Sequence, residues 1–154
     1  MKIVTLYLDS SVLGGYFDDA FEEATRTLWR QMKQGRFHFV SSLLVDQEIS
    51  AAPERVQKLM AETFTQADLL PYTQAAEELA AAYLAQKVVP AKFADDARHV
   101  AIAVVNGVGI VASWNFKHLV NLQREAGFNA VNLLQGCPAV RIVSPLELIY
   151  DDEE

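Results

Sequence analysis

The chain opens with the stretch IVTLYLDSSVLGG at residues 3–15. Its first six residues are apolar, aromatic or β-branched, which favours a buried strand over Ile3–Leu8. Asp9 closes this run and is followed by serines and glycines, which are typical of a strand that ends in a loop. In an open parallel α/β sheet, ligands collect beyond the carboxyl ends of the strands. We therefore expect Asp9 to face a functional site.

Short apolar runs alternate with longer helical patterns in the rest of the chain, an order typical of βαβ units. Further strands are predicted at Phe37–Ser41, Ala67–Leu70, Gly109–Ser113 and Val140–Val143. Helices are predicted at Phe21–Gln34, Ser42–Ala52, Pro53–Ala61, Tyr72–Gln86, Asp95–Asn106 and Phe116–Glu125, the last one stopping at Gly127. Residues 144–147 match a capping box with proline at the first helical position. The sequence thus predicts an α/β fold with a mostly parallel sheet.

Size and composition indicate one folded domain. A chain of 154 residues buries about two-thirds of its unfolded surface. Hydrophobic residues make up 51% of the chain, and 5 prolines and 7 glycines leave no room for long linkers. We expect a single domain over residues 1–150 and an acidic C-terminal tail over residues 151–154.

The sequence favours a cytoplasmic protein without a membrane span. Asp9 interrupts the first apolar run, and no small-residue cleavage pattern follows it. The longest later apolar stretch, Val100–Val105, is far shorter than the roughly 20 residues of a membrane helix. Cys137 is the only cysteine, which excludes intramolecular disulfides and cysteine-rich zinc sites.

Three carboxylates, Asp9, Glu48 and Asp96, are the candidate chemical groups. Each has a structural alternative: a turn former at Asp9, a helix-surface residue at Glu48, and a helix-start residue complementing the dipole at Asp96. Asp9 follows a strand and the other two lie near helix starts, so a parallel fold can gather them at one sheet edge. Oxygen ligands suit hard cations, and the arrangement therefore predicts a Mg²⁺ or Mn²⁺ site.

Four segments, taken in order, resemble the successive motifs of PIN domains. They are LYLDSSV at 6–12, the helix with Glu48, DARHVAIA at 96–103 and VASWNF at 111–116. The resemblance spans nearly the whole chain. It implies a three-layer α/β/α sandwich, and many PIN domains are metal-dependent ribonucleases, including the toxins of bacterial toxin–antitoxin pairs.

Carried over by motif, the resemblance makes Asp9, Glu48 and Asp96 the core acids, with Asp95 as the neighbouring candidate. Asp9 is then the main direct metal ligand, Asp96 a direct or water-mediated ligand, and Glu48 a ligand or a base for the attacking water. The reaction is hydrolysis of RNA phosphodiester bonds without a side-chain nucleophile. An antitoxin protein and a homodimer are the partners that the resemblance permits.

One position departs from the family pattern. Many members carry a fourth acid two residues after a small hydroxyl residue, whereas this chain has Ser113 and then Asn115. An amide oxygen can ligate a cation or orient a water, but it brings no charge. Weaker metal affinity, or one ion in place of two, is the expected consequence. Ser10 is the candidate hydroxyl beside Asp9, where it could hold the carboxylate or touch a phosphate.

The net charge of −7 counts against binding to a phosphate backbone, although residues 151–154 supply four of the negative charges. Arg98, Lys117 and Arg124 are the cations that could meet a phosphate near the site. The histidines, at positions 38, 99 and 118, do not form a zinc pattern, although His99 lies one turn after Asp96. Trp114 is expected to pack in the core rather than stack on a base.

Two other functions compete with a nuclease. A PIN-like binding or scaffold domain without activity is supported by Asn115 and the acidic surface. A response-regulator-like domain also uses acids at strand ends, but it requires a lysine at the end of the last strand, where this chain has Ser144.

Overall fold

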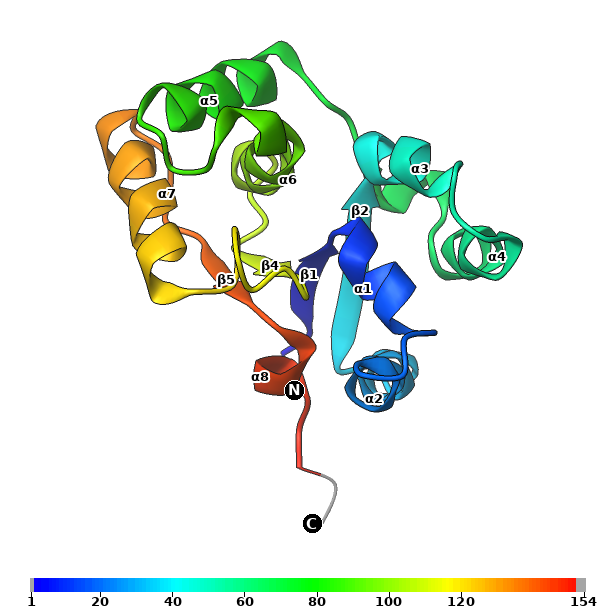
Figure 1. The fold of residues 1–154 in the computed structure, drawn as a ribbon. Coiled ribbons are helices and arrows are strands. Elements are labelled where there is room, and N and C mark those ends of the chain that lie inside the picture. Colours follow the sequence, from blue (N-terminus) through cyan, green and yellow to red (C-terminus); the bar gives the residue numbers. More distant parts are fainter. Residues whose placement is uncertain (1, 152–154) are drawn as a thin grey trace.

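A central parallel sheet organises the fold. The computed structural model describes residues 2–151, and within this range five strands form one sheet in the order β3-β2-β1-β4-β5 (Figure 1). All neighbouring strands are parallel. The strands are β1 (Val4–Leu8), β2 (Phe37–Ser42), β3 (Leu69–Leu70), β4 (Ile110–Ala112) and β5 (Arg141–Val143).

Helices cover both faces of the sheet. They are α1 (Ser10–Gly15), α2 (Glu22–Lys33), α3 (Leu43–Ile49), α4 (Glu54–Thr63), α5 (Gln74–Ala85), α6 (Ala94–Val105), α7 (Leu122–Leu134) and α8 (Pro145–Leu148). Two short 3₁₀ turns lie at Gln66–Asp68 and Ala91–Phe93. The chain places β2 and β3 on one side of β1, and then β4 and β5 on its other side. Because crossovers between parallel strands are right-handed, this change of direction puts α1–α4 on one face of the sheet and α5–α7 on the other (Figure 1). The predicted three-layer α/β/α sandwich is confirmed.

The core lies on both faces of the central strand β1. Leu6, Tyr7 and Leu8 have no solvent-exposed surface, as expected for a parallel strand that helices cover on both sides. In α6 every residue from Val100 to Val104 is buried, so this helix forms much of the second layer. No helix within residues 2–151 is long and apolar enough to cross a bilayer.

The segment after β1 is a helix, where the sequence predicted a loop. The Asp9 side chain accepts a hydrogen bond from the Val12 amide and so caps α1. Capping satisfies an otherwise unpaired amide of the first turn, which offsets the low helix propensity of serine and glycine. The chain therefore turns sharply at Asp9 and leaves its carboxylate at the sheet edge.

The helix predicted at Phe116–Glu125 exists, but its predicted bounds are wrong, because α7 spans Leu122–Leu134. Residues 115–120 form a compact turn, in which the Leu119 and Val120 amides bond to the Asn115 carbonyl oxygen. The Asn121 side chain caps the next turn through the Arg124 amide, so α7 begins at Leu122. The sequence pattern missed this asparagine cap and placed the helix too early.

Gly127 does not stop α7 but lies inside it. A Cβ atom added there would lie 3.1 Å from Val88 Cγ1, so glycine permits the close approach of α7 to the segment that follows α5. The helix ends instead at Gly136, which has a positive φ of 73°.

The C-terminal helix α8 agrees with one of its two predicted signals. Pro145 occupies the first turn, as predicted, but the Ser144 side chain makes no capping hydrogen bond. The predicted capping box is therefore wrong. Of the predicted acidic tail, residues 152–154 lie outside the described residues.

Gly15 provides a test of the packing beneath α1. A Cβ atom there would lie 2.7 Å from Trp114 Cδ1 and Nε1. The indole ring has little freedom to move, because its Nε1 donates to Thr25 Oγ1 and Phe21 stacks on it with a centroid distance of 4.3 Å. We predict that Gly15→Ala lowers the free energy of unfolding by about 1–3 kcal/mol, as overpacking does, in urea denaturation.

Gly14 is the matched control for that substitution. It lies in the same helix, and no atom within 4 Å would meet an added Cβ. Gly14→Ala should therefore leave stability unchanged or raise it by up to about 1 kcal/mol. Equal behaviour of the two variants would contradict the packing described here.

Candidate active site

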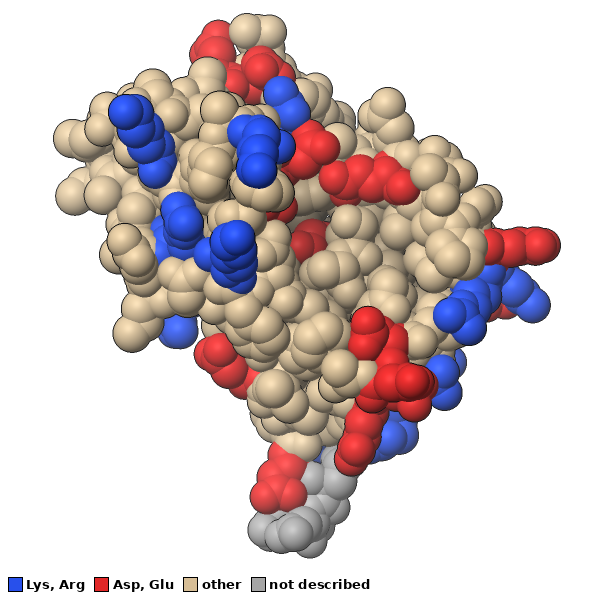
Figure 2. Space-filling model, viewed as in Figure 1, with Lys and Arg blue, Asp and Glu red and all other residues tan. Residues whose placement is uncertain are grey.

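The candidate site lies where the strand order reverses. β1 and β4 are neighbours, and the chain leaves their carboxyl ends toward opposite faces of the sheet. The Asp9 amide bonds to the Ala112 carbonyl oxygen at 3.3 Å, which brings Asp9 beside Ser113. In the space-filling view, acidic atoms lie inside a hollow of the surface (Figure 2). Such a switch point is the usual place for a ligand in open α/β sheets.

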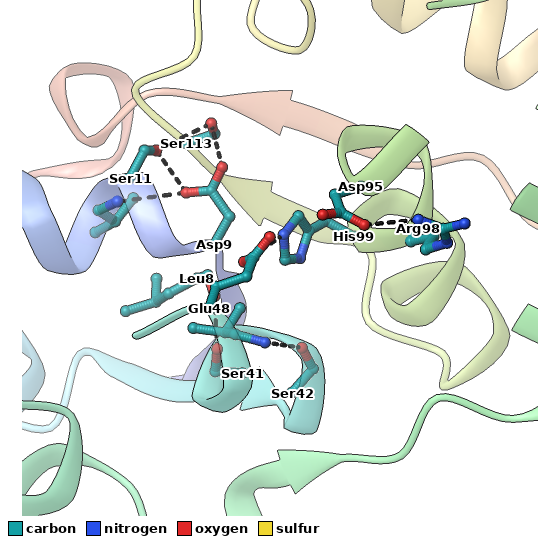
Figure 3. A network of polar contacts seen from close by, with 12 residues as sticks. Leu8, Asp9, Ser11, Ser41, Ser42, Glu48, Asp95, Arg98, His99 and Ser113 are labelled. Carbon is teal, nitrogen blue, oxygen red and sulfur yellow. Dashed lines mark hydrogen bonds and ion pairs between the residues drawn. The ribbon is translucent and has the colours of Figure 1, made fainter. Parts of the chain in front are cut away.

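Asp9 is buried and held by two serines. Ser11 Oγ donates to one carboxylate oxygen and Ser113 Oγ to the other, each at 2.6 Å (Figure 3). Only 4% of Asp9 is exposed, and burial raises the pKa of its carboxyl above the usual value. The nearby His99 and the hydrogen bonds oppose this rise without cancelling it. A negative charge at this position is therefore destabilised and would be relieved by a cation.

The same serines tie the two strand ends together. Ser11 Oγ accepts a hydrogen bond from the Trp114 amide at 2.8 Å, and Ser113 Oγ accepts one from the Asn115 amide at 2.9 Å. Ser11, rather than the predicted Ser10, therefore holds Asp9. Ser10 occupies the first position of α1 beside the carboxylate and is partly exposed.

A buried hydrogen-bond chain leads from β1 to Glu48. Tyr7 Oη lies 2.8 Å from Ser42 Oγ and 2.7 Å from His99 Nδ1. His99 Nε2 lies 3.0 Å from Glu48 Oε1 (Figure 3). Because a carboxylate only accepts hydrogen bonds, Nε2 carries a proton. Tyr7 and Asp9 are two residues apart on one strand, so they point to the same side of the sheet.

His99 lies among the three predicted acids. Burial alone would lower its pKa, but the hydrogen bond to Glu48 and the charges of Glu48, Asp9 and Asp96 together raise the pKa above the usual value. The structure thus brings the three carboxylates to one region, with the imidazole as their shared neighbour. The interaction of His99 with Asp96, one turn earlier in the sequence, is electrostatic, whereas its hydrogen bond goes to Glu48.

Asp96 faces the site and Asp95 does not. Asp96 lies 3.4 Å from His118 Nδ1 and accepts a hydrogen bond from the Asn115 side chain. Burial raises its pKa, and the charge of Asp9 raises it further, against the lowering effect of the two histidines and of the amide. Asp95 is 53% exposed and pairs with Arg98 at 2.7 Å (Figure 3).

Asn115 has both ends of its amide in use. Its oxygen accepts the His118 amide at 3.0 Å, and its side chain also bonds to Asp96. The residue therefore positions Asp96 and shapes the turn after β4. From the sequence, Asn115 was expected only to ligate a cation or to orient a water molecule.

The donor chemistry of this region suits a hard divalent cation. Asp9 and Asp96 are near enough to raise each other's electrostatic energy, and both offer oxygen atoms only. Within residues 2–151, however, no three or more His, Cys, Asp or Glu side chains converge closely enough to form a complete metal-binding group. Two carboxylates suffice where water and a substrate phosphate supply the remaining ligands. Asp9 and Asp96 therefore fit such an ion, while Glu48 is turned toward His99.

Neither a comparison with protein-family models nor a search among curated proteins finds a match for this chain.

Several residues of the site were missed by sequence reasoning. Tyr7 was assigned to the core, although its place two residues before Asp9 on the strand was a usable signal. Ser42 was predicted to start a helix, but not to bond a tyrosine. The pairing of His118 with Asp96 joins residues far apart in the sequence, and no local pattern predicts it. Trp114 is buried, as predicted.

The chain from Tyr7 to Glu48 can be tested by removing one hydroxyl. We predict that Tyr7→Phe lowers the free energy of unfolding by about 1–3 kcal/mol, because His99 Nδ1 loses its buried partner. Tyr83→Phe is the matched control, since Tyr83 Oη is also buried and bonds to Asn132 Oδ1 away from the site. Both variants should lose stability in urea denaturation, and only Tyr7→Phe should change any activity of the site. Equal effects of the two variants on activity would contradict a positioning role for Tyr7.

The raised pKa of Asp96 predicts an unusual dependence of stability on pH. The folded protein binds this proton more tightly than the unfolded chain, so the stabilisation is fully present below the unfolded pKa of about 3.9 and is lost as pH rises through the folded pKa. Asp96→Asn cannot ionise. In chelator it should raise the Tm at pH 8 by a few degrees, and this gain should shrink as the pH falls toward 4.

Asp95→Asn is the control for that experiment. Asp95 is exposed, and its surface ion pair with Arg98 contributes little to stability. Its Tm should stay close to that of the wild type across the same pH range. A gain for Asp95→Asn equal to that of Asp96→Asn would show that burial at position 96 is not the cause.

Proposed function

We propose that this chain is a PIN-like, Mg²⁺- or Mn²⁺-dependent endoribonuclease. The observation that carries the proposal is a pair of carboxylates, the buried Asp9 and the partly buried Asp96, beside the carboxyl ends of β1 and β4. Burial raises the pKa of both against the opposing effect of nearby histidines, so a bound cation would stabilise their negative charge. Perturbed carboxylates in a hollow at a switch point favour a functional site over a structural one.

Each residue of the site has a role in the proposed hydrolysis. Asp9 and Asp96 would hold the ion, and the serines at positions 11 and 113 keep the Asp9 carboxylate in a fixed orientation. When bound, a divalent cation acidifies water and neutralises negative charge on the phosphate. Glu48 is the proposed acceptor of the proton from the attacking water, and His99, which holds Glu48 at 3.0 Å, stabilises its charge.

The proposed substrate is RNA, and the proposed partners are an antitoxin protein and a second copy of the chain. The PIN-like motifs favour RNA as the substrate and a toxin that an antitoxin protein restrains in the cytoplasm. The apolar residues Leu122, Leu133 and Leu134 are well exposed on α7, which permits a homodimer.

A second candidate function is a PIN-like binding or scaffold domain without catalysis. Two observations favour it: Asn115 brings no fourth charge, and Glu48 is engaged with His99 rather than with Asp9 and Asp96. Metal binding separates the two functions, because the scaffold requires no ion.

The nuclease is tested by incubating the protein with mixed-sequence single-stranded RNA in Mn²⁺, in Mg²⁺ and in chelator. Metal-dependent cutting is expected in the wild type. Asp9→Asn and Asp96→Asn should each lower the rate by at least about 100-fold, because removing a ligand removes charge stabilisation in the transition state. Both variants should also lose the rise in Tm that Mn²⁺ gives the wild type.

Asp95→Asn is again the matched control, because it removes the same charge one residue away from Asp96. It should cut RNA at a rate within about threefold of the wild type, since Asp95 pairs with Arg98 outside the carboxylate pair. An intact fold with neither cutting nor a Mn²⁺-dependent rise in Tm would overturn the nuclease and favour the scaffold.

A further inference from the structure

The two walls of the hollow differ in charge. Figure 2 shows lysine and arginine side chains gathered on one side of the acidic hollow, over α6, α7 and their connections, while acidic side chains border the other side. The basic side chains are therefore concentrated on one surface, although the net charge of the chain is −7. This arrangement weakens the objection that net charge raises against a nucleic-acid ligand.

Two chain segments form the basic side. Residues 86–94 run from the end of α5 to the first residue of α6, and residues 113–124 run from the end of β4 into the first turn of α7; neither segment contains an Asp or a Glu. Arg124 Nη1 donates to the Val88 carbonyl oxygen at 2.5 Å, and the Phe93 and His118 rings lie 4.1 Å apart, so the segments lie side by side. Their cations, which we call the basic rim, are Lys87, Lys92, Lys117 and Arg124.

A series of side-chain contacts links the basic rim to Asp96. Lys92 Nζ lies 5.2 Å from the centre of the Phe93 ring, that ring contacts His118, and His118 lies 3.4 Å from Asp96. Lys117 is exposed and directly precedes His118 in the chain. Lys92 is therefore linked to Asp96 through the Phe93 and His118 rings, and Lys117 is the chain neighbour of the histidine that contacts Asp96.

The cations of the basic rim are available to a ligand. Within residues 2–151, no ion pair joins any of them to an acid. Phe116, next to Lys117 in the chain, is 46% exposed, so an exposed aromatic ring lies one residue from this cation. Lysines interleaved with an exposed aromatic ring suit single-stranded nucleic acid, whose phosphates and unpaired bases can bind together.

The opposite wall of the hollow is acidic. A cavity there is lined by Glu48, Glu77 and Asp95, with Arg98 as its cation. Arg98 is already paired with Asp95. A polyanion is therefore repelled from this wall and attracted to the other one.

We infer that the basic rim is the surface along which a polynucleotide backbone binds, so that the strand approaches the carboxylates from the α6–α7 side only. Lys92 and Lys117 contact the phosphates nearest to the cleaved bond, and Lys87 and Arg124 contact phosphates further along. The inference rests on the proposed nuclease function and adds to it the residues that position the substrate. They do not touch the reacting atoms.

The test is fluorescence anisotropy with a labelled 12-nucleotide single-stranded RNA of mixed sequence, in chelator so that no cutting occurs. The Lys92→Gln, Lys117→Gln double variant should bind at least about 10-fold more weakly at low salt. The slope of log K against log salt should fall by about 1.4, because each of the two phosphates that the lysines no longer neutralise accounts for about 0.7. In Mn²⁺ the same variant should raise KM much more than it lowers kcat.

Lys2→Gln, Lys58→Gln is the matched control, with the same change of net charge. Both residues are exposed. Lys2 lies before the amino-terminal end of β1, and Lys58 lies in α4. This variant should keep the wild-type affinity and salt slope. Equal decreases in affinity for the two double variants would overturn the inference, because net charge alone would then explain binding. Displacement of the RNA by polyglutamate at equal charge would also overturn it, in favour of an acidic protein ligand.

The outcomes separate this inference from the proposed function. Metal-dependent cutting that does not depend on Lys92 and Lys117 overturns the basic rim and leaves the nuclease intact. RNA binding through the basic rim without any cutting in Mn²⁺ overturns the nuclease and leaves the binding surface intact.

Discussion

The buried carboxylate of Asp9 is the constraint on which the rest of the site depends. It caps α1 through the Val12 amide and is held by a hydroxyl from each of two strand ends, at Ser11 and Ser113. Burial of an ionised group is costly unless it is paired or hydrogen-bonded. The hydrogen bonds satisfy its oxygens, but no cationic side chain forms a salt bridge with it among residues 2–151, and the nearby His99 offsets only part of the cost of burying its charge. The fold thus retains a buried carboxylate that a bound cation would stabilise.

The other two carboxylates, Glu48 and Asp96, are also held by neighbouring side chains. Glu48 is held by His99, which in turn bonds to Tyr7 on the strand that carries Asp9. Asp96 is held by the Asn115 amide and lies beside His118. Each carboxylate is thus oriented by at least one hydroxyl, amide or imidazole group, and these partners come from α1, α6 and the segment after β4. A catalytic site requires side chains that are held in place in this way. The same burial that fixes the acids makes their negative charges costly to the stability of the fold.

Much of the fold could be predicted from the sequence, and the site only in part. The apolar run before Asp9 and the alternation of strands and helices determined the parallel sheet, since both are local patterns. The helix after Asp9 and the late start of α7 were missed because side-chain caps, at Asp9 and Asn121, override the local propensity. The contacts of His118 with Asp96 and of Tyr7 with His99 join distant segments, and only the three-dimensional structure brings them together.

The proposed metal centre is tested most directly by anomalous diffraction from a crystal of the protein soaked in Mn²⁺. An anomalous difference peak is expected within bonding distance of both the Asp9 and the Asp96 carboxylates, and no such peak is expected in a soaked crystal of Asp96→Asn. Well-ordered density for both carboxylates without a peak between them, or a peak that persists unchanged in the variant, would contradict the proposal that this pair is the metal centre.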